Sequence, residues 1–286
     1  MGSNIRSIFI STNNTVYVTD QTQARVIIWN DGNSIPIRNL SGNLSQPSGL
    51  FVTVTNQIYV DSDNATGIIT QWMMNSPIGI PVMYTCSKCY QIFVDTDNNL
   101  YCSMWLTHQI IRKSLNTASN ALVIVAGTGI AGNTPTRLNS PYGIFVDLNS
   151  DLYVADYANN RIQLFQFQQL SGTTVAGSGS ANVTIQLNHP TAVVLDADNY
   201  LYISDTFNHR IVSSGPNGFR CIAGCSRLAG VASDQFNLPS ALSFDNYGNV
   251  FVIDYNNQRI QKFTLLTGLC SKHIKLPNIL ESFLLL

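Results

Sequence analysis

The sequence repeats itself six times, and this repeat restricts the fold more than any other feature. Aligning the copies on one aromatic position gives a period of about 42 to 52 residues. The aromatic anchors of the six copies are Tyr17, Tyr59, Tyr101, Tyr153, Tyr202 and Phe251. Repeats of this length are typical of β-propellers, in which each repeat forms one blade.

Each repeat contains short β-rich runs separated by turn residues. In the clearest copy, residues 140–165, one run starts at Pro141, a polar turn opens at Asp147, and the third run follows Arg161. A fourth run comes about 20 to 24 residues after the anchor, for example at residues 173–176. Such runs form antiparallel strands, and propeller blades pack on both faces. The sequence therefore predicts an all-β fold, a six-bladed β-propeller of four-stranded antiparallel blades.

Three motifs of the fourth repeat carry a family resemblance. Pro-x-Gly-Ile-Phe-Val-Asp (141–147), Leu-Tyr-Val-Ala-Asp (152–156) and Asn-Asn-Arg-Ile-Gln-Leu-Phe (159–165) resemble the NHL-repeat family of six-bladed β-propellers. The resemblance covers nearly the whole chain and is strongest in repeats four to six. That family includes substrate-recognition propellers of ubiquitin ligases, RNA-binding propellers, extracellular sensor domains and a few lyase-type enzymes. The resemblance therefore implies a fold without implying one function.

The repeats account for almost the entire chain, so we expect residues 1–286 to form one β-propeller domain. The tail 277–286 is expected to lie outside the blades. Residues 272–275 lie about 22 residues after Phe251, which is the offset of the fourth strand in other repeats. We therefore expect residues 272–275 to form the outer strand of the sixth blade.

The charge composition argues against a nucleic-acid partner. The net charge is −1 and 11% of the residues are charged, whereas binding to a phosphate backbone needs a basic patch. The run Leu284–Leu286 is too short to span a bilayer, so no membrane span is expected. The N-terminal residues lack the pattern of a signal peptide, and we expect a monomer.

An aspartate three residues after the anchor and an arginine eight residues after it vary together. Repeats two and three lack both residues, as a paired carboxylate and guanidinium would require. The sequence therefore predicts structural ion pairs, with ligand contact as the alternative. The pairs are Asp20 with Arg25, Asp156 with Arg161, Asp205 with Arg210, and Asp254 with Arg259.

The cysteines allow a disulfide, free thiols or a metal site. Cys89 occupies the position of the repeat proline and Cys102 lies within a predicted strand, so a disulfide between neighbouring strands fits the repeat better than zinc. Cys221 and Cys225 form a second close pair. Disulfides would favour an extracellular location over a cytoplasmic one, although the compartment stays open. The G-x-G-x-x-G at 127–132 precedes another blade instead of a helix, so no cofactor is expected.

One face of the propeller is expected to collect aromatic and histidine side chains. In a four-stranded blade, the loop joining strands two and three emerges on the same face as the links between blades. The candidate binding residues on this face are Trp105, His108, Tyr157, Phe207, His209 and Tyr255. Rings on rigidly held loops are frequent recognition anchors, and the alternative is that each ring covers its own hairpin.

The sequence contains no H-E-x-x-H, G-x-S-x-G or Walker motif, and we identify no catalytic, metal-binding or cofactor-binding residue. We therefore expect a non-catalytic binding propeller that recognises a protein, peptide or glycan through one loop face. One alternative is a propeller hydrolase or lyase with a metal in its channel. Others are the substrate-recognition arm of a ubiquitin ligase and an RNA-binding propeller.

Overall fold

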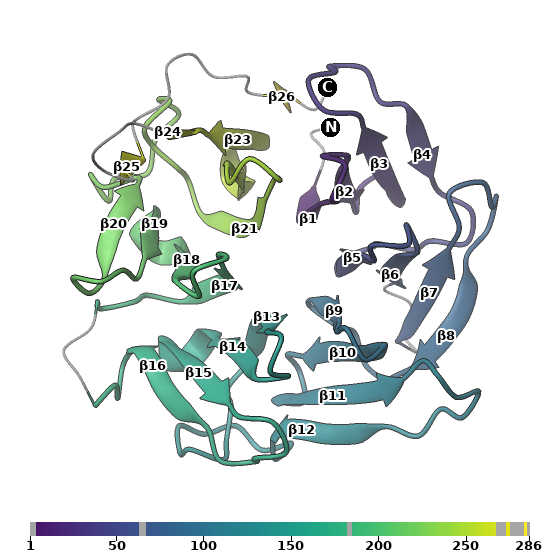
Figure 1. Cartoon of the computed structure of the whole chain (residues 1–286), viewed down its shortest axis with the longest axis horizontal. Coiled ribbons are helices and arrows are strands. Elements are labelled where there is room, and N and C mark those ends of the chain that lie inside the picture. The colour runs from purple at the N-terminus through teal and green to yellow at the C-terminus, as the bar shows by residue number, and fades with distance from the viewer. Residues whose placement is uncertain (1–3, 63–66, 182–184, 267–272, 275–282, 285–286) are drawn as a thin grey trace.

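Six four-stranded antiparallel sheets surround a central axis in the computed structural model (Figure 1). The structure describes residues 4–62, 67–181, 185–266, 273–274 and 283–284. The prediction of a six-bladed β-propeller is therefore confirmed.

In each of the first three blades the four strands follow the chain order, with the first strand nearest the axis. Their bounds are, in blade one, β1 (Ile5–Ile10), β2 (Val16–Asp20), β3 (Arg25–Trp29) and β4 (Arg38–Leu40); in blade two, β5 (Leu50–Val52), β6 (Ile58–Ser62), β7 (Ile68–Trp72) and β8 (Ile80–Tyr84); and in blade three, β9 (Ile92–Val94), β10 (Asn99–Met104), β11 (Gln109–Ser114) and β12 (Val123–Gly127).

Blades four to six repeat the pattern and add a short 3-10 helix after each second strand. Their bounds are, in blade four, β13 (Pro141–Val146), β14 (Leu152–Asp156), η1 (Tyr157–Asn159), β15 (Arg161–Phe165) and β16 (Thr173–Gly177); in blade five, β17 (Pro190–Leu195), β18 (Leu201–Asp205), η2 (Thr206–Asn208), β19 (Arg210–Ser213) and β20 (Arg220–Ala223); and in blade six, β21 (Pro239–Phe244), β22 (Val250–Asp254), η3 (Tyr255–Asn257), β23 (Arg259–Phe263) and β26 (Phe283–Leu284).

The hydrophobic core lies between the blades. One cluster joins Tyr17 and Ile28 of blade one to Leu50 and Val60 of blade two, and similar clusters fill the other spaces between neighbouring blades. Every residue of β2 is buried, because a sheet with a neighbour on each face has no solvent side. This packing explains why the strands are apolar at both odd and even positions.

The sixth blade is closed by a different C-terminal segment from the one expected. Arg259 and Ile260 of β23 pair with Leu284 and Phe283 of β26. The strand β25 (His273–Ile274) pairs instead with β24 (Leu265–Leu266) in a separate two-stranded sheet. The prediction that residues 272–275 supply the outer strand is therefore wrong. Phe283–Leu284 also departs from the expectation that residues 277–286 lie outside the blades, while the rest of that tail is outside the described residues.

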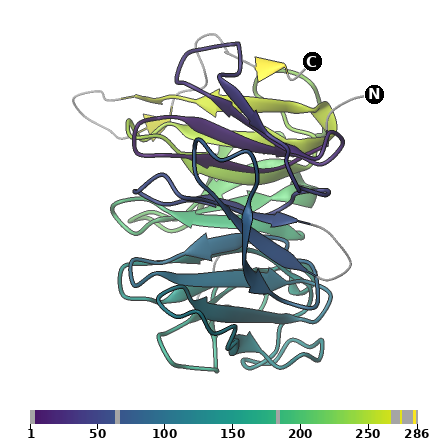
Figure 2. The ribbon, with the colours of Figure 1, turned by 90° about the vertical axis from the view of Figure 1, so that its right-hand side faces the viewer.

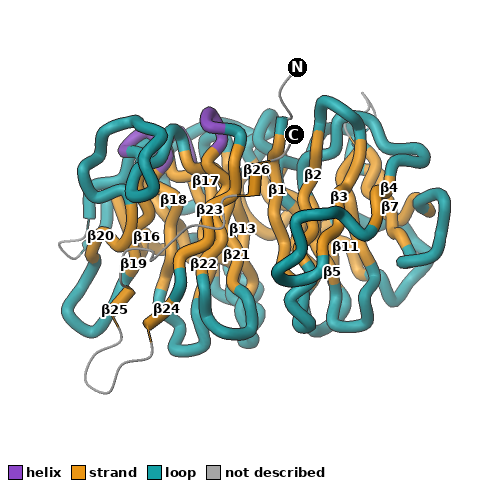
Figure 3. Tube along the Cα trace, turned by 90° about the horizontal axis from the view of Figure 1, so that it is seen from above, coloured by secondary structure: helices purple, strands orange, loops and turns teal. Residues whose placement is uncertain are grey.

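The loops gather on two opposite faces of the ring (Figure 2). The upper face carries η1, η2 and η3, which are purple in Figure 3. The links between blades, such as residues 128–140, lie on the same face. The lower face carries the turns between first and second strands, such as residues 147–151. Residues 128–140 join β12 to β13, so the G-x-G-x-x-G at 127–132 lies at a blade link, as expected.

Candidate binding face

Four buried ion pairs hold the loops between second and third strands on the upper face. In each pair the arginine Nε donates to the aspartate Oδ2 at 2.7 to 3.1 Å, and the aspartate is fully buried. The pairs are Asp20 with Arg25, Asp156 with Arg161, Asp205 with Arg210, and Asp254 with Arg259. The structure thus brings together all four pairs named from the sequence.

The pair in blade four also anchors the link from blade three. Asp156 Oδ1 accepts the amide of Asn139 at 2.7 Å, and Arg161 donates to the carbonyl of Asn133 at 2.8 Å. Burial raises the pKa of Asp156 above its ordinary value, while hydrogen bonds from Asn159 and Asn139 and the charge of Arg161 lower it. Both charged groups are buried within the loop, so their geometry suits a scaffold better than a ligand contact.

The candidate histidines His108 and His209 anchor blade links in the same way. The Nδ1 of His108 accepts the amide of Ser140 at 3.0 Å, and the Nδ1 of His209 accepts the amide of Leu238 at 3.2 Å. Both residues have the left-handed conformation, with φ of 53° and 52°. Asn160 holds the matching position of blade four, with φ of 55°, and its side-chain oxygen accepts the amide of His189. An acceptor at this position therefore fastens each of these blades to the next.

Three tyrosines form a continuous stack on the upper face. The ring centroids of Tyr90 and Tyr142 are 3.9 Å apart, and those of Tyr142 and Tyr157 are 4.2 Å apart, with interplanar angles of 17° and 15°. Tyr90 and Tyr142 each lie next to the residue at the repeat's proline position, in adjacent blades. Burial raises the pKa of all three hydroxyls, so the stack is neutral at ordinary pH.

Three more rings extend this stack. Trp105 contacts Tyr142 edge to face at 6.2 Å, and His189 lies 4.6 Å from Tyr157 and 4.8 Å from Phe207 between ring centroids. We call the combined set the aromatic cluster. It consists of Tyr90, Trp105, Tyr142, Tyr157, His189 and Phe207. Residues of blades three, four and five thus form one surface, of which Phe207 is 46% exposed.

The last candidate, Tyr255, belongs to a second group. The guanidinium carbon of Arg6 lies 4.8 Å from the centroid of the Tyr255 ring, and Arg6 Nε donates to Gln21 Oε1 at 3.0 Å. Arg6 has no carboxylate partner within the part of the chain that the structure describes. This group therefore offers a positive charge on the same face as the aromatic cluster.

Sequence reasoning missed Arg6, Tyr90, Tyr142 and His189. The first three share one repeat position, eleven residues before the anchor, which holds Ser or Thr in the other copies. This position changes in chemistry from copy to copy while its neighbours in the repeat stay similar. That contrast could have identified it from the sequence. The stacking of Tyr90 on Tyr142 gave no signal, because the two residues belong to different repeats.

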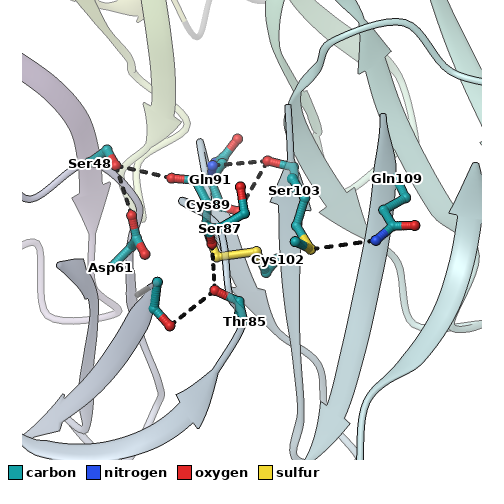
Figure 4. Close-up of a disulfide and its surroundings, with 11 residues drawn as sticks. Ser48, Asp61, Thr85, Ser87, Cys89, Gln91, Cys102, Ser103 and Gln109 are labelled. Atoms are coloured by element: carbon teal, nitrogen blue, oxygen red, sulfur yellow. Dashed lines mark hydrogen bonds between the residues drawn. A yellow bond between two sulfur atoms is a disulfide. The ribbon is translucent and has the colours of Figure 1, made fainter. Parts of the chain in front are cut away.

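Four cysteines form two disulfides, so they are neither free thiols nor metal ligands. Cys89 and Cys102 are bonded, with Cα atoms 5.3 Å apart, in blade three (Figure 4). Cys221 and Cys225 are bonded in blade five, with Cα atoms 5.7 Å apart. The disulfide prediction is confirmed for both pairs, and Cys86 is a free exposed thiol. Zinc ligation by Cys89 and Cys102 is excluded in this bonded state.

The described residues offer neither a metal-binding group nor a membrane-spanning helix. Among those residues, no group of three or more histidine, cysteine or acidic side chains could hold a metal ion. In the same part of the chain, no helix has the length and apolar character needed to cross a membrane.

The fold and the repeat together define the class as a six-bladed β-propeller that carries an NHL repeat. The NHL repeat family model matches residues 236–263, which include β22, η3 and β23. The resemblance to NHL repeats is therefore confirmed at those residues. No curated protein matched the chain in a sequence search.

Several solved structures share this fold at low identity. A protein of unknown function from Bacteroides thetaiotaomicron is 17% identical with a TM-score of 0.71, covering 91% of this chain and 69% of its own. Inactive virginiamycin B lyase from Staphylococcus aureus, solved with quinupristin, is 14% identical with a TM-score of 0.63, covering 98% and 84%. The nidogen/laminin complex contains a chain 14% identical with a TM-score of 0.62, covering 92% and 89%. These identities show the fold alone.

Proposed function

We propose that this propeller is a non-catalytic binding module that recognises a protein partner through a peptide segment docked on the aromatic cluster. The observation that carries the proposal is the continuous contact of six rings supplied by three blades. Aromatic side chains on a rigid scaffold are the commonest energetic centres of protein interfaces.

The loops that present these rings are already fixed. Tyr157 follows Asp156, whose carboxylate is held by Arg161 at 2.8 Å, and Phe207 lies two residues after Asp205, held by Arg210 at 2.7 Å. A loop ordered before binding loses little conformational entropy when the partner docks. The ion pairs thus support recognition indirectly, by holding the rings in place.

The charge at the edge of the face favours an acidic partner segment. Arg6 is half-buried beside Tyr255 and forms no ion pair with any described carboxylate. A carboxylate of the partner would satisfy this guanidinium with charge-assisted hydrogen bonds. The preferred segment would therefore combine an apolar or aromatic anchor with an acidic residue.

The alternative of a lyase or hydrolase rests on fold likeness alone, since virginiamycin B lyase is 14% identical to this chain. The two candidate histidines, His108 and His209, use Nδ1 to accept backbone amides, which supports loop anchoring instead of acid–base chemistry. Binding is therefore the function that the described geometry supports best.

The proposal is tested by selecting peptides from a random displayed library on the purified protein and measuring the Kd of each selected peptide by calorimetry. Phe207→Ala and Tyr157→Ala should each weaken binding about 10- to 30-fold, the size expected for a hot-spot ring. Arg6→Ala should weaken those peptides that carry an acidic residue and leave the others unchanged.

The matched control is Tyr247→Ala, which removes a 67% exposed tyrosine from a turn of the lower face. It should leave the Kd unchanged, and all variants should melt within a few degrees of the wild type. Selected peptides that ignore the Phe207 and Tyr157 substitutions, or a library that yields no binder, would remove the basis of the proposal.

A further inference from the structure

The lower mouth of the channel holds a cavity that the proposed function does not use. Its volume is about 730 Å³, and four phenylalanines of successive blades line it. They occupy the same position of the innermost strands, eight residues before the anchor, and are Phe9, Phe51, Phe93 and Phe145. A cavity of this size is within the usual range for sites that bind small molecules.

The four rings form a ladder that leaves part of each ring uncovered. Successive centroids lie 4.9, 4.7 and 5.3 Å apart, with interplanar angles of 60°, 54° and 61°. Rings tilted in this way meet edge to face and do not cover one another as stacked rings do. All four are half-buried, so the cavity is lined by aromatic surface that remains accessible.

The charges around this cavity have a single sign. Asp95, Asp147 and Asp196 line it, and none of the described residues that line it is a lysine or arginine. None of the three carboxylates forms an ion pair with a basic side chain among the residues described. In each one, Oδ1 accepts backbone amides of its own turn, which orients the carboxylate without neutralising its charge.

We infer that the lower mouth binds a small organic cation, such as an alkyl or aryl quaternary ammonium. Aromatic faces attract cations through the ring quadrupole, and quaternary ammonium groups are the ligands most often held by such rings. The carboxylates supply the opposite charge at the rim. Val54 and Leu148, which are 80% and 87% exposed, also line this cavity and add apolar surface for the hydrocarbon part of the ligand.

The inference is tested with choline and the bulkier benzyltrimethylammonium, titrated into the purified protein and followed by ligand-observed NMR. The neutral isostere of choline, 3,3-dimethylbutan-1-ol, has the same shape without the charge. We expect saturable binding of both cations and about tenfold weaker binding of the alcohol. Cation binding should weaken further as salt is added, because the carboxylates are near the surface.

Two variants locate the site. Phe93→Leu removes the ring that contacts a neighbour on each side and keeps an apolar side chain, so cation affinity should fall about tenfold. Asp147→Asn keeps an oxygen that can accept the amides of Asn149 and Asp151, so the turn should remain folded while affinity falls about threefold. Tyr157→Ala, on the upper face, should leave cation binding unchanged.

Three results would each overturn the inference. The first is the absence of saturable binding of either cation at tens of millimolar. The second is equal affinity for choline and its neutral isostere. The third is wild-type affinity in Phe93→Leu and Asp147→Asn variants whose melting temperatures show that they are folded. None of these results bears on the peptide site, because that site lies on the opposite face.

Discussion

The upper ends of blades three and four are held by different bonds. In blade four, Asp156 at the end of β14 accepts the amide of Asn139 from the incoming link and pairs with Arg161. In blade three, Met104 and Gln109 stand at the two matching positions, with the amide of Gln109 3.9 Å from the sulfur of Met104. There the Cys89–Cys102 disulfide joins the incoming chain to β10.

Blade two keeps one of the two interactions found in blade four. Ser62 stands where blade four has Asp156, and its hydroxyl accepts the amide of Ser45 at 2.9 Å. Ser45 matches Asn139 in the repeat, so the hydrogen bond to the incoming link is kept while the ion pair is lost. The comparison teaches that blades two to six each have a bond between the incoming link and the second strand or the loop that follows it. The chemistry of that bond differs among a carboxylate, a hydroxyl and a disulfide.

The largest expected effect is in blade four, where Arg161→Ala should destabilise the protein by about 3–5 kcal/mol. The change leaves the carboxylate of Asp156, which is fully buried, without its charged partner. Chemical denaturation measures the effect. The double variant Asp156→Ala with Arg161→Ala should cost less than the sum of the two single changes. Additive losses would show that the pair is not coupled.

The next effect is in blade three, where replacing Cys89 and Cys102 together by alanine should cost about 3 kcal/mol. The bond closes a loop with a sequence separation of 13, and its loss frees the unfolded chain. The matched control replaces Cys221 and Cys225, whose separation of 4 predicts a smaller loss of about 2 kcal/mol. Thermal melting with and without a reductant compares the two. An equal loss at both sites would contradict the dependence on loop length.

A weaker version of the first effect is expected in blade one. Arg25→Ala should destabilise by about 1–2 kcal/mol, because a hydrogen bond to a charged group contributes about that much when it is partly accessible to water. The Arg25 side chain is 20% exposed and its Nε lies 3.1 Å from Asp20, against 6% and 2.8 Å for Arg161. The same denaturation assay measures both. An equal loss of stability in the two blades would show that the burial of the arginine does not determine how much its ion pair contributes.

The smallest effect is expected when the disulfide of blade three is replaced by an ion pair like that of blade four. In the variant without Cys89 and Cys102, adding Met104→Asp together with Gln109→Arg should restore about 1 kcal/mol. Either substitution alone should destabilise, since it places one charge without a partner, at the buried position 104 or at the half-buried position 109. A pair that restores no stability would show that the surroundings of blade three cannot accept the ion pair.

The contacts within a single blade could be predicted from the sequence, because both partners lie at known positions of one repeat. The pairing of Asp156 with Arg161 spans five residues and recurs at three other places, so its joint loss in blades two and three indicated a partnership. The disulfide between Cys89 and Cys102 was predictable because both cysteines occupy known positions of neighbouring strands. In each case the two partners belong to one blade.

The closing strand shows where local reasoning failed. Residues 272–275 had the correct offset from the anchor, yet Phe283–Leu284 pairs with β23 and His273–Ile274 pairs with β24. Spacing along the chain limits how far a segment can reach. It does not choose between two short segments that can both reach the same edge, because that choice depends on which strand pairing is more stable.

The sequence by itself determined the number of blades, the inner three strands of each blade and the four aspartate–arginine pairs, because these recur with the repeat. Only the tertiary structure decided which side chains of different blades meet. Tyr90 and Tyr142 stack because the ring arrangement places the inner edges of neighbouring blades side by side around one axis. The phenylalanine ladder of the lower mouth arises in the same way. A contact between repeats depends on the radius and twist of the closed ring, and no single repeat contains that information.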